Sequence, residues 1–248
     1  MTVVLDIQRF DPERDASPSS KKYRVEVEPT DRVLDALLQI KRTDDTTLTF
    51  RKSCAHGVCG SDAMRINGKE RLACKTLFQE VADSDGDTVR IEPLRHLSIQ
   101  RDLMVDQTPF FSNYASVTPF LVPAAKEGDQ EYIQSQKERE AFDDATKCIL
   151  CQACVSACPV MDENPNFIGP AAIVQAARFV FDSRDAGFTD RLAVLDQPDG
   201  VWSCDNHFEC TKVCPREIKI TKLINPTKRK IKQYREDEST SAPADRSE

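Results

Sequence analysis

Four closely spaced cysteines in the second half of the chain are the residues whose spacing most directly indicates chemistry. They follow the pattern Cys148-x2-Cys151-x2-Cys154-x3-Cys158-Pro159. In bacterial ferredoxins with this spacing, the first three thiolates hold one iron–sulfur cluster and the fourth ligates another. A structural zinc site is the alternative, but zinc favours two separated cysteine pairs. The spacing therefore favours iron–sulfur clusters.

A second cysteine run, Cys204-x5-Cys210-x3-Cys214-Pro215, complements the first. If the two runs exchange their last cysteines, as in two-cluster ferredoxins, Cys214 completes the cluster begun by the first run. We therefore predict a [4Fe–4S] cluster held by Cys148, Cys151, Cys154 and Cys214. The cysteines left for another cluster are Cys158, Cys204 and Cys210.

The identity of this last cluster depends on His207. In the ferredoxin register the second run reads Cys204-x2-His207-x2-Cys210, so His207 stands where a complete cubane has its fourth thiolate. A missing ligand implies a missing iron, and we predict a [3Fe–4S] cluster on Cys158, Cys204 and Cys210. The alternative is that His207 itself binds a fourth iron, since imidazole is an accepted iron ligand.

A different pattern occurs near the N-terminus, where Cys54-x4-Cys59-x2-Asp62-x11-Cys74 matches plant-type [2Fe–2S] spacing with aspartate at the third position. We predict that Cys54, Cys59, Asp62 and Cys74 hold this cluster, with Ser61 a poorer candidate than Asp62. A Rieske centre using His56 and His207 is the alternative, but the long gap between them argues against it. His56 is then a solvent-facing loop residue.

The segments on either side of the Cys54–Cys74 site are expected to form a small sheet domain. Tyr23–Glu28 alternates in polarity as a half-buried strand does. Asn67-Gly68 favours a tight hairpin between 64–66 and 71–73. We also expect a helix from Thr30 to Lys41 that packs on the sheet, and a last strand over 88–94.

The remainder of the chain reads as helical. Prolines and the charged run 137–140 indicate a connector that ends in a solvated helix, and Pro170 marks the start of an apolar helix. The predicted fold class is α+β. We expect a sheet domain at 1–105, a connector at 106–146, a helical domain at 147–235 and a disordered tail at 236–248.

Composition narrows the function classes. The 248 residues carry 34 Lys and Arg against 41 Asp and Glu, and a net charge of −7 argues against nucleic acid as a partner. We find no secretory signal and no stretch near ~18 apolar residues, so we expect an intracellular protein that reaches a membrane only through a partner. Nucleotide-binding and hydrolase motifs are also missing from the sequence. An electron relay between partner proteins fits better than a substrate-binding enzyme.

Six sequence features, taken in this order, carry a family resemblance. They are Cys54–Asp62, Cys74, Cys148–Pro159, Phe167–Pro170, Asp182–Asp185 and Cys204–Pro215. Over about residues 3–232 the chain resembles the iron–sulfur subunits of succinate dehydrogenase. The resemblance implies a β-grasp ferredoxin domain followed by a bacterial-ferredoxin-like helical domain. It also implies an FAD-containing flavoprotein partner that oxidises succinate, and membrane-anchor subunits with a quinone site, with or without haem.

The resemblance further implies that electrons pass from flavin through the Cys54, Cys148 and Cys158 clusters to quinone. Because no transit peptide appears, we expect the protein at the cytoplasmic face of a prokaryotic membrane. Candidates for lining the quinone site are Pro159, Trp202, Asp205 and His207. Asp62 favours succinate oxidation, because many fumarate reductases have cysteine there. The alternative functions are the equivalent subunit of a fumarate reductase, that of another flavin-linked oxidoreductase, and, from a different class, a zinc-binding interaction module.

A basic segment, Lys228–Lys232 with Arg235, precedes the acidic tail. It reads as a solvated helix end or as a contact to anionic lipid headgroups.

Overall fold

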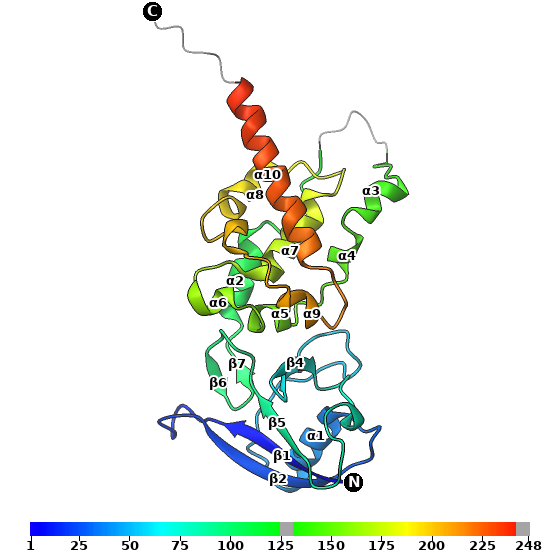
Figure 1. Cartoon of the computed structure of the whole chain (residues 1–248), viewed down its shortest axis with the longest axis vertical. Helices are drawn as coiled ribbons and strands as arrows, with labels where there is room; N and C mark the ends of the chain where they lie inside the picture. Colours follow the sequence, from blue (N-terminus) through cyan, green and yellow to red (C-terminus); the bar gives the residue numbers. More distant parts are fainter. Residues whose placement is uncertain (125–130, 242–248) are drawn as a thin grey trace, which may run out of the picture.

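The computed structural model describes residues 1–124 and 131–241. Two domains follow each other along the long axis of the molecule, with the N-terminal sheet domain at one end and the helical domain above it (Figure 1). The last helix runs along the helical domain, and its C-terminal end lies at the far end, away from the sheet. This order agrees with the predicted α+β class.

A five-stranded mixed sheet forms the N-terminal domain. Its strands lie in the order β2-β1-β5-β3-β4, with β1 and β5 parallel and the other pairs antiparallel. Helix α1 and the 3₁₀ turn η1 belong to the same domain, and β6 and β7 form a separate hairpin. The bounds are β1 Thr2–Arg9, β2 Ser19–Glu26, α1 Val33–Thr43, β3 Ala63–Ile66, β4 Lys69–Leu72, η1 Phe78–Glu80, β5 Thr88–Glu92, β6 Ile99–Arg101 and β7 Met104–Val105.

Alternating side chains explain how this sheet and α1 share one core. Val3, Leu5 and Ile7 are buried on one face of β1, because successive strand residues point to opposite sides. Leu34 and Leu37, at helical spacing on α1, belong to the same apolar cluster. The predicted packing of the helix on the sheet is confirmed.

Local predictions in this domain differ from the structure at one helix start and at the last strand. Strand β5 ends at Glu92 and not at 94, and β6 and β7 follow it. The hairpin at Asn67-Gly68 is confirmed, with φ of 50° and 76° at these residues, as a tight turn of this kind requires. Helix α1 begins at Val33 and not near Thr30. The Asp35 carboxylate accepts a hydrogen bond from the Arg32 backbone N–H at 3.3 Å, and this interaction fixes the start.

Helices pack around α7 to form the second domain. Pro170 lies in the first turn of α7, as predicted, and nearly all of the helix is buried. The last helix, α10, packs against it through Ile224 and Ile231. The bounds are α2 Thr108–Ser116, α3 Gln136–Glu140, α4 Asp143–Thr146, α5 Ala153–Ser156, α6 Val160–Glu163, α7 Gly169–Val180, α8 Phe188–Leu195, η2 Val201–Ser203, α9 Glu209–Lys212 and α10 Thr221–Ser241.

The segment 106–146, predicted as a connector, contributes to the second core. Phe110, Val117 and Ala145 are buried among the helical-domain residues, whereas α3 has no buried residue and is solvated as expected. At the other end, α10 continues through Ser241 into the predicted tail, and the rest of that prediction, 242–248, lies outside the described residues. Over 236–241 the chain is therefore helical and not disordered, although these residues are polar.

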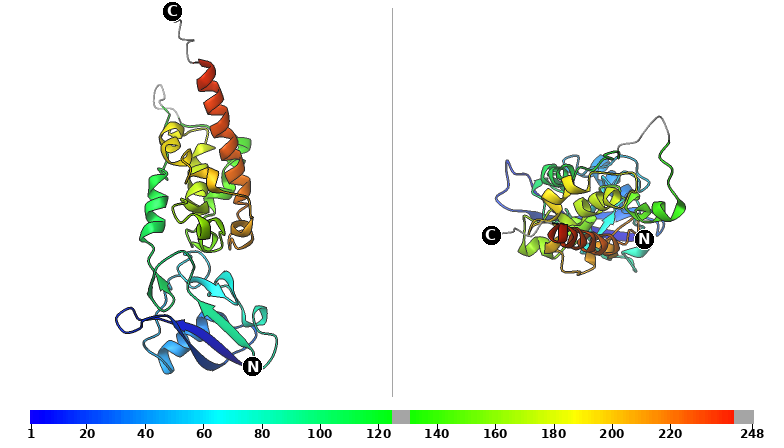
Figure 2. Two further views of the ribbon diagram at one scale, coloured as in Figure 1. Left: turned by 60° about the vertical axis from the view of Figure 1, so that its left-hand side comes forward. Right: turned by 90° about the horizontal axis from the view of Figure 1, so that it is seen from above.

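The two domains meet where α5 lies against β4, and the contacts between them are both polar and apolar. Figure 2 shows the helical domain stacked on the sheet domain. The Ser156 hydroxyl, fully buried, donates to Glu70 at 2.8 Å and accepts from the Arg95 backbone N–H at 2.9 Å. Ile149 and Cys151 of the helical domain pack against the apolar core of the sheet domain. The loop that begins the Cys148–Cys158 run is therefore held directly against the sheet domain.

Candidate iron–sulfur sites

The loop from Cys54 to Gly60 is shaped to surround a sulfur atom. Three backbone N–H groups point at the Cys54 Sγ, from His56 at 3.5 Å, Val58 at 3.4 Å and Cys59 at 3.3 Å. These donors lower the pKa of the Cys54 thiol to about 6, because they stabilise the thiolate. Such N–H···S contacts are one means by which a protein sets the potential of a cluster.

Asp62 lies at this site with one carboxylate oxygen left over. Its side chain is almost fully buried, and Oδ2 accepts a hydrogen bond from the Cys74 backbone N–H at 2.6 Å. Oδ1 has no hydrogen-bond partner in the part of the chain that the structure describes. A buried carboxylate oxygen without a partner is costly unless it meets a cation. The arrangement therefore suits coordination of iron by Oδ1.

Cys74 differs from Cys54 in its surroundings. Burial, with the nearby Asp62 carboxylate, raises the pKa of Cys74 to about 12. A thiol with a raised pKa needs nearby positive charge to become a thiolate, and iron supplies that charge when bound. His56 is exposed, and its Nδ1 lies 2.7 Å from the Cys54 carbonyl oxygen, so it takes part in the loop's own hydrogen bonding, as expected for a loop residue.

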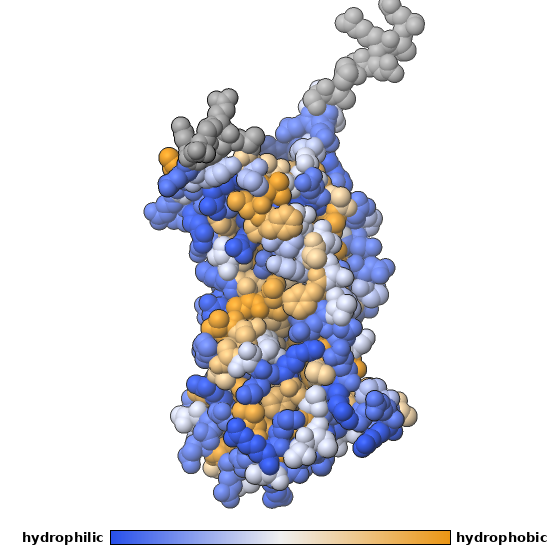
Figure 3. Space-filling model, turned by 180° about the vertical axis from the view of Figure 1, so that it is seen from behind, coloured by the Kyte–Doolittle hydropathy of each residue, from blue (hydrophilic) through white to orange (hydrophobic). Residues whose placement is uncertain are grey.

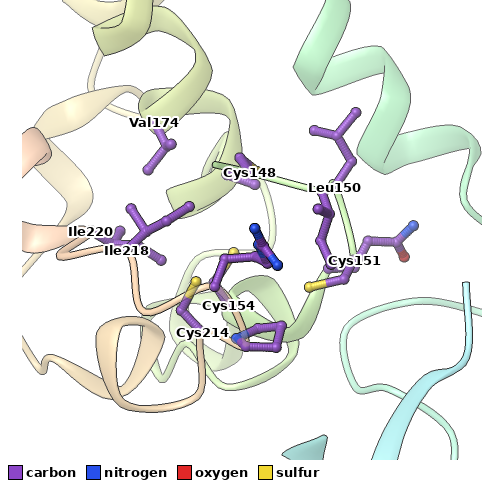
Figure 4. Close-up of a pocket in the computed structure, with 13 residues that line it drawn as sticks. Cys148, Leu150, Cys151, Cys154, Val174, Cys214, Ile218 and Ile220 are labelled. Atoms are coloured by element: carbon purple, nitrogen blue, oxygen red, sulfur yellow. The ribbon is translucent and has the colours of Figure 1, made fainter. Parts of the chain in front are cut away.

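One cavity of about 380 Å³ joins the two cysteine runs at the second site (Figure 4). Three of its cysteines come from the loop before α5 and from α5 itself, and the fourth comes from the distant second run. The predicted members Cys148, Cys151, Cys154 and Cys214 all line it. The remaining wall is largely apolar and includes Val174, Ile218 and Ile220.

Left-handed backbone conformations at Leu150 and Gln152, with φ of 55° and 69°, let this loop fold around the cavity. Burial raises the pKa of Cys148, raises that of Cys151 to about 12, and raises that of Cys154 well above its usual value. Dry, neutral thiols grouped in this way become stable thiolates only beside a strongly positive centre. A [4Fe–4S] cluster fits this donor set.

Sequence reasoning did not assign a role to Gln175, which lies buried in the apolar helix α7. Its side chain hydrogen-bonds to Cys148 and lowers the pKa of that thiol, against the larger effect of burial. The only sequence signal was the interruption of an apolar stretch by a polar residue. Only the folded helix brings that residue to the cysteine.

The third site is a smaller cavity of about 310 Å³ at the start of α6 and α9. Cys158, Cys204 and Cys210 line it, and so do Asp205 and His207. Burial, with the nearby Cys158 and Cys204, raises the pKa of Cys210 to about 12. Three thiols and no fourth thiol at this cavity agree with a cluster that has one ligand fewer.

The quinone-site candidates separate into two groups. Pro159, Asp205 and His207 lie at the third cavity, and Phe208 beside them is 50% exposed with a left-handed φ of 64°. Trp202 does not line this cavity. Its indole N–H donates to Asp196 at 2.8 Å.

In the described ranges 1–124 and 131–241, no three His, Cys, Asp or Glu side chains converge on a single ion. Zinc needs four ligands at about 2.0–2.3 Å from one point. All ten cysteines are free thiols and are therefore available as ligands.

A sheet domain with one cysteine loop, followed by a helical domain with two cysteine-lined cavities, defines a multi-cluster iron–sulfur protein. Family models agree in type and order: a 2Fe-2S iron-sulfur cluster binding domain matches residues 4–112, and a 4Fe-4S dicluster domain matches residues 144–218. The chain therefore has [2Fe–2S] and [4Fe–4S] domains in the predicted order.

Whole-length relatives identify the family. The chain is 42% identical over 220 residues to the fumarate reductase iron-sulfur subunit of Mycobacterium tuberculosis, covering 87% of each protein. It is 38% identical over 221 residues to the succinate dehydrogenase iron-sulfur subunit of Paracoccus denitrificans, covering 88% of this chain and 84% of that one. A chain of the Mycobacterium smegmatis Sdh1 complex in its apo form superimposes with a TM-score of 0.83 at 29% identity, covering 94% and 96% of the two chains.

The chain belongs to the family of succinate dehydrogenase and fumarate reductase iron–sulfur subunits. Its function is electron transfer as part of a complex of this oxidoreductase class.

Proposed function

We propose that this chain relays electrons from an FAD-containing flavoprotein that oxidises succinate to a membrane quinone, through three clusters. The observation that carries the proposal is the pairing of Cys214 with the first cysteine run around one cavity, while Cys158 joins the second run around another. The bound clusters supply one-electron transfer. The chain itself supplies the ligands, their burial and the contacts between the loops.

The proposed ligands follow the three sites. They are Cys54, Cys59, Asp62 and Cys74 for [2Fe–2S], Cys148, Cys151, Cys154 and Cys214 for [4Fe–4S], and Cys158, Cys204 and Cys210 for [3Fe–4S]. The partnerless Oδ1 supports Asp62 over Ser61, whose hydroxyl already lies 3.1 Å from Cys59 Sγ. His207 is exposed at the third cavity, and we propose that it faces the quinone end and does not bind iron.

Exposed apolar side chains near the first and last sites support docking of a partner at each end. Val58, in the loop of the first cluster, is 55% exposed. Phe208, which lines the third cavity, is 50% exposed. Figure 3 shows apolar residues in a broad band along one face that extends over both domains. We propose that the flavoprotein covers the Val58 loop and that a membrane-anchor subunit covers Phe208, with Pro159, Asp205 and His207 next to the quinone.

No helix in the described part of the chain is both long and apolar enough to cross a bilayer. We propose peripheral attachment at the cytoplasmic face through the anchor subunits. The relatives carry the names of both directions of the reaction, and Asp62 leads us to propose succinate oxidation.

Purification of the complex from its native membrane tests this function. We expect an FAD-containing subunit to copurify, succinate to bleach the iron–sulfur absorption, and a quinone analogue to restore it. The chain alone should show no reduction by succinate. A complex whose clusters are reduced by another donor but not by succinate would contradict the proposed donor.

A further inference from the structure

Lys228 reaches from α10 to the third site. Its ammonium group donates a hydrogen bond to the backbone carbonyl oxygen of Cys204 at 2.6 Å, across 24 residues of sequence. Cys204 is one of three cysteines that line this cavity. The contact places a full positive charge within a few bonds of the Cys204 thiol.

This charge is not neutralised by an ion pair. No carboxylate is paired with Lys228 among the described residues, whereas Arg235 on the same helix is paired with Asp196. Lys228 is also half-buried, so solvent screens its charge less than that of the exposed Asp205 beside Cys204. Lys228 therefore contributes positive charge to this part of the cavity.

A neighbouring residue on the same helix has a different position. Lys230 donates to the Val180 carbonyl and lies over the Phe181 and Phe188 rings, at 5.6 and 4.9 Å from their centroids. Two residues along a helix is a rotation of about 200°. The two lysines thus make similar bonds to backbone carbonyls, but only Lys228 bonds to a residue of the third site.

We propose that Lys228 raises the reduction potential of the cluster held by Cys158, Cys204 and Cys210. This inference rests on the proposed function, since it assumes a cluster at that site. Reduction adds one electron and makes the site more negative by one charge, with no bond formed or broken. A fixed positive charge stabilises that reduced form, because opposite charges attract strongly in a half-buried place. A higher potential favours the electron on this cluster, which is the one nearest the quinone in the proposed relay.

Potentiometric titration of the purified complex, followed by low-temperature electron paramagnetic resonance (EPR), tests the proposal. In Lys228→Met we expect the midpoint of the oxidised-state signal of this cluster to fall by about 59 mV, a tenfold change in the one-electron equilibrium. Lys228→Gln should fall similarly, because it keeps a donor but loses the charge. Lys228→Arg should keep the wild-type midpoint.

Lys230→Met is the matched control, because it also removes a lysine bound to a carbonyl of this domain. A midpoint in Lys228→Met equal to that of Lys230→Met would overturn the proposal, as would a wild-type midpoint in Lys228→Gln. If the wild-type complex lacks the oxidised-state signal altogether, the proposed ligand set fails instead. A signal that is present but insensitive to Lys228 rejects only the role of this lysine.

Discussion

Substitution of Gly60 by alanine tests how closely the first two cluster loops must approach. A methyl group on Gly60 would lie 2.6 Å from Cβ and 2.9 Å from Cα of Cys151, and the residue has a φ of +69°. The left-handed backbone costs an alanine about 1–2 kcal/mol. Forcing a methyl group into a packed contact costs about 1–3 kcal/mol more. We expect Gly60→Ala to destabilise the protein by the sum, about 2–5 kcal/mol.

Gly57→Ala is the matched control, because Gly57 has a φ of +80° in the same loop. Its methyl group would meet only the Lys75 side chain, at 2.7 Å from Cδ, and that exposed chain can move aside. We therefore expect only the backbone cost of about 1–2 kcal/mol. Thermal unfolding of the cluster-loaded chain at one scan rate compares the two variants, and each kcal/mol of destabilisation should lower the melting temperature by about 2–4 °C. Equal melting temperatures for the two variants would refute the close contact with Cys151.

Three further substitutions address the first site, the helical domain and the domain interface. Asp62→Ala should lose or weaken the [2Fe–2S] signal in EPR, because a buried oxygen ligand is removed, and an unchanged spectrum at full occupancy would reject the ligand. Arg191→Met should destabilise the protein by about 3–5 kcal/mol in denaturant unfolding, since it leaves the buried Asp185, now 2.7 Å from Arg191, without its partner. Wild-type stability of the Arg191→Met variant would contradict this role of the buried ion pair. Ser156→Ala should cost about 1–3 kcal/mol by leaving Glu70 buried with one hydrogen bond fewer, while Ser53→Ala, at an exposed site, should change stability by less than about 0.5 kcal/mol.

Sequence patterns predicted the chemistry better than they predicted the contacts. The cysteine spacings were informative because ligand spacing on a loop is local, and the exchange of Cys214 and Cys158 followed from a known arrangement of two runs. Cys214 lines the same cavity as the first run, and Cys158 lines the same cavity as Cys204 and Cys210. The hairpin at Asn67-Gly68 was equally local, since the two residues themselves permit its positive φ angles.

Long-range contacts were beyond reach of the sequence. The Lys228 contact to Cys204 depends on how α10 crosses the domain. From the sequence, the basic segment that contains Lys228 was predicted to be either a solvated helix end or a contact to lipid headgroups. Likewise the predicted connector packs into the second core because Arg191, fully buried, binds the carbonyl oxygens of Thr118 and Phe120. A buried arginine cannot be recognised in sequence before its partners are known.

Low-temperature EPR of the purified complex, first air-oxidised and then reduced, tests the central claim most directly. We predict an intense [3Fe–4S] signal in the oxidised state, and [2Fe–2S] and [4Fe–4S] signals after reduction. Three distinct signals would agree with three different ligand sets and with His207 free of iron. Absence of the oxidised-state signal at full iron content would contradict the account and indicate that His207 binds a fourth iron.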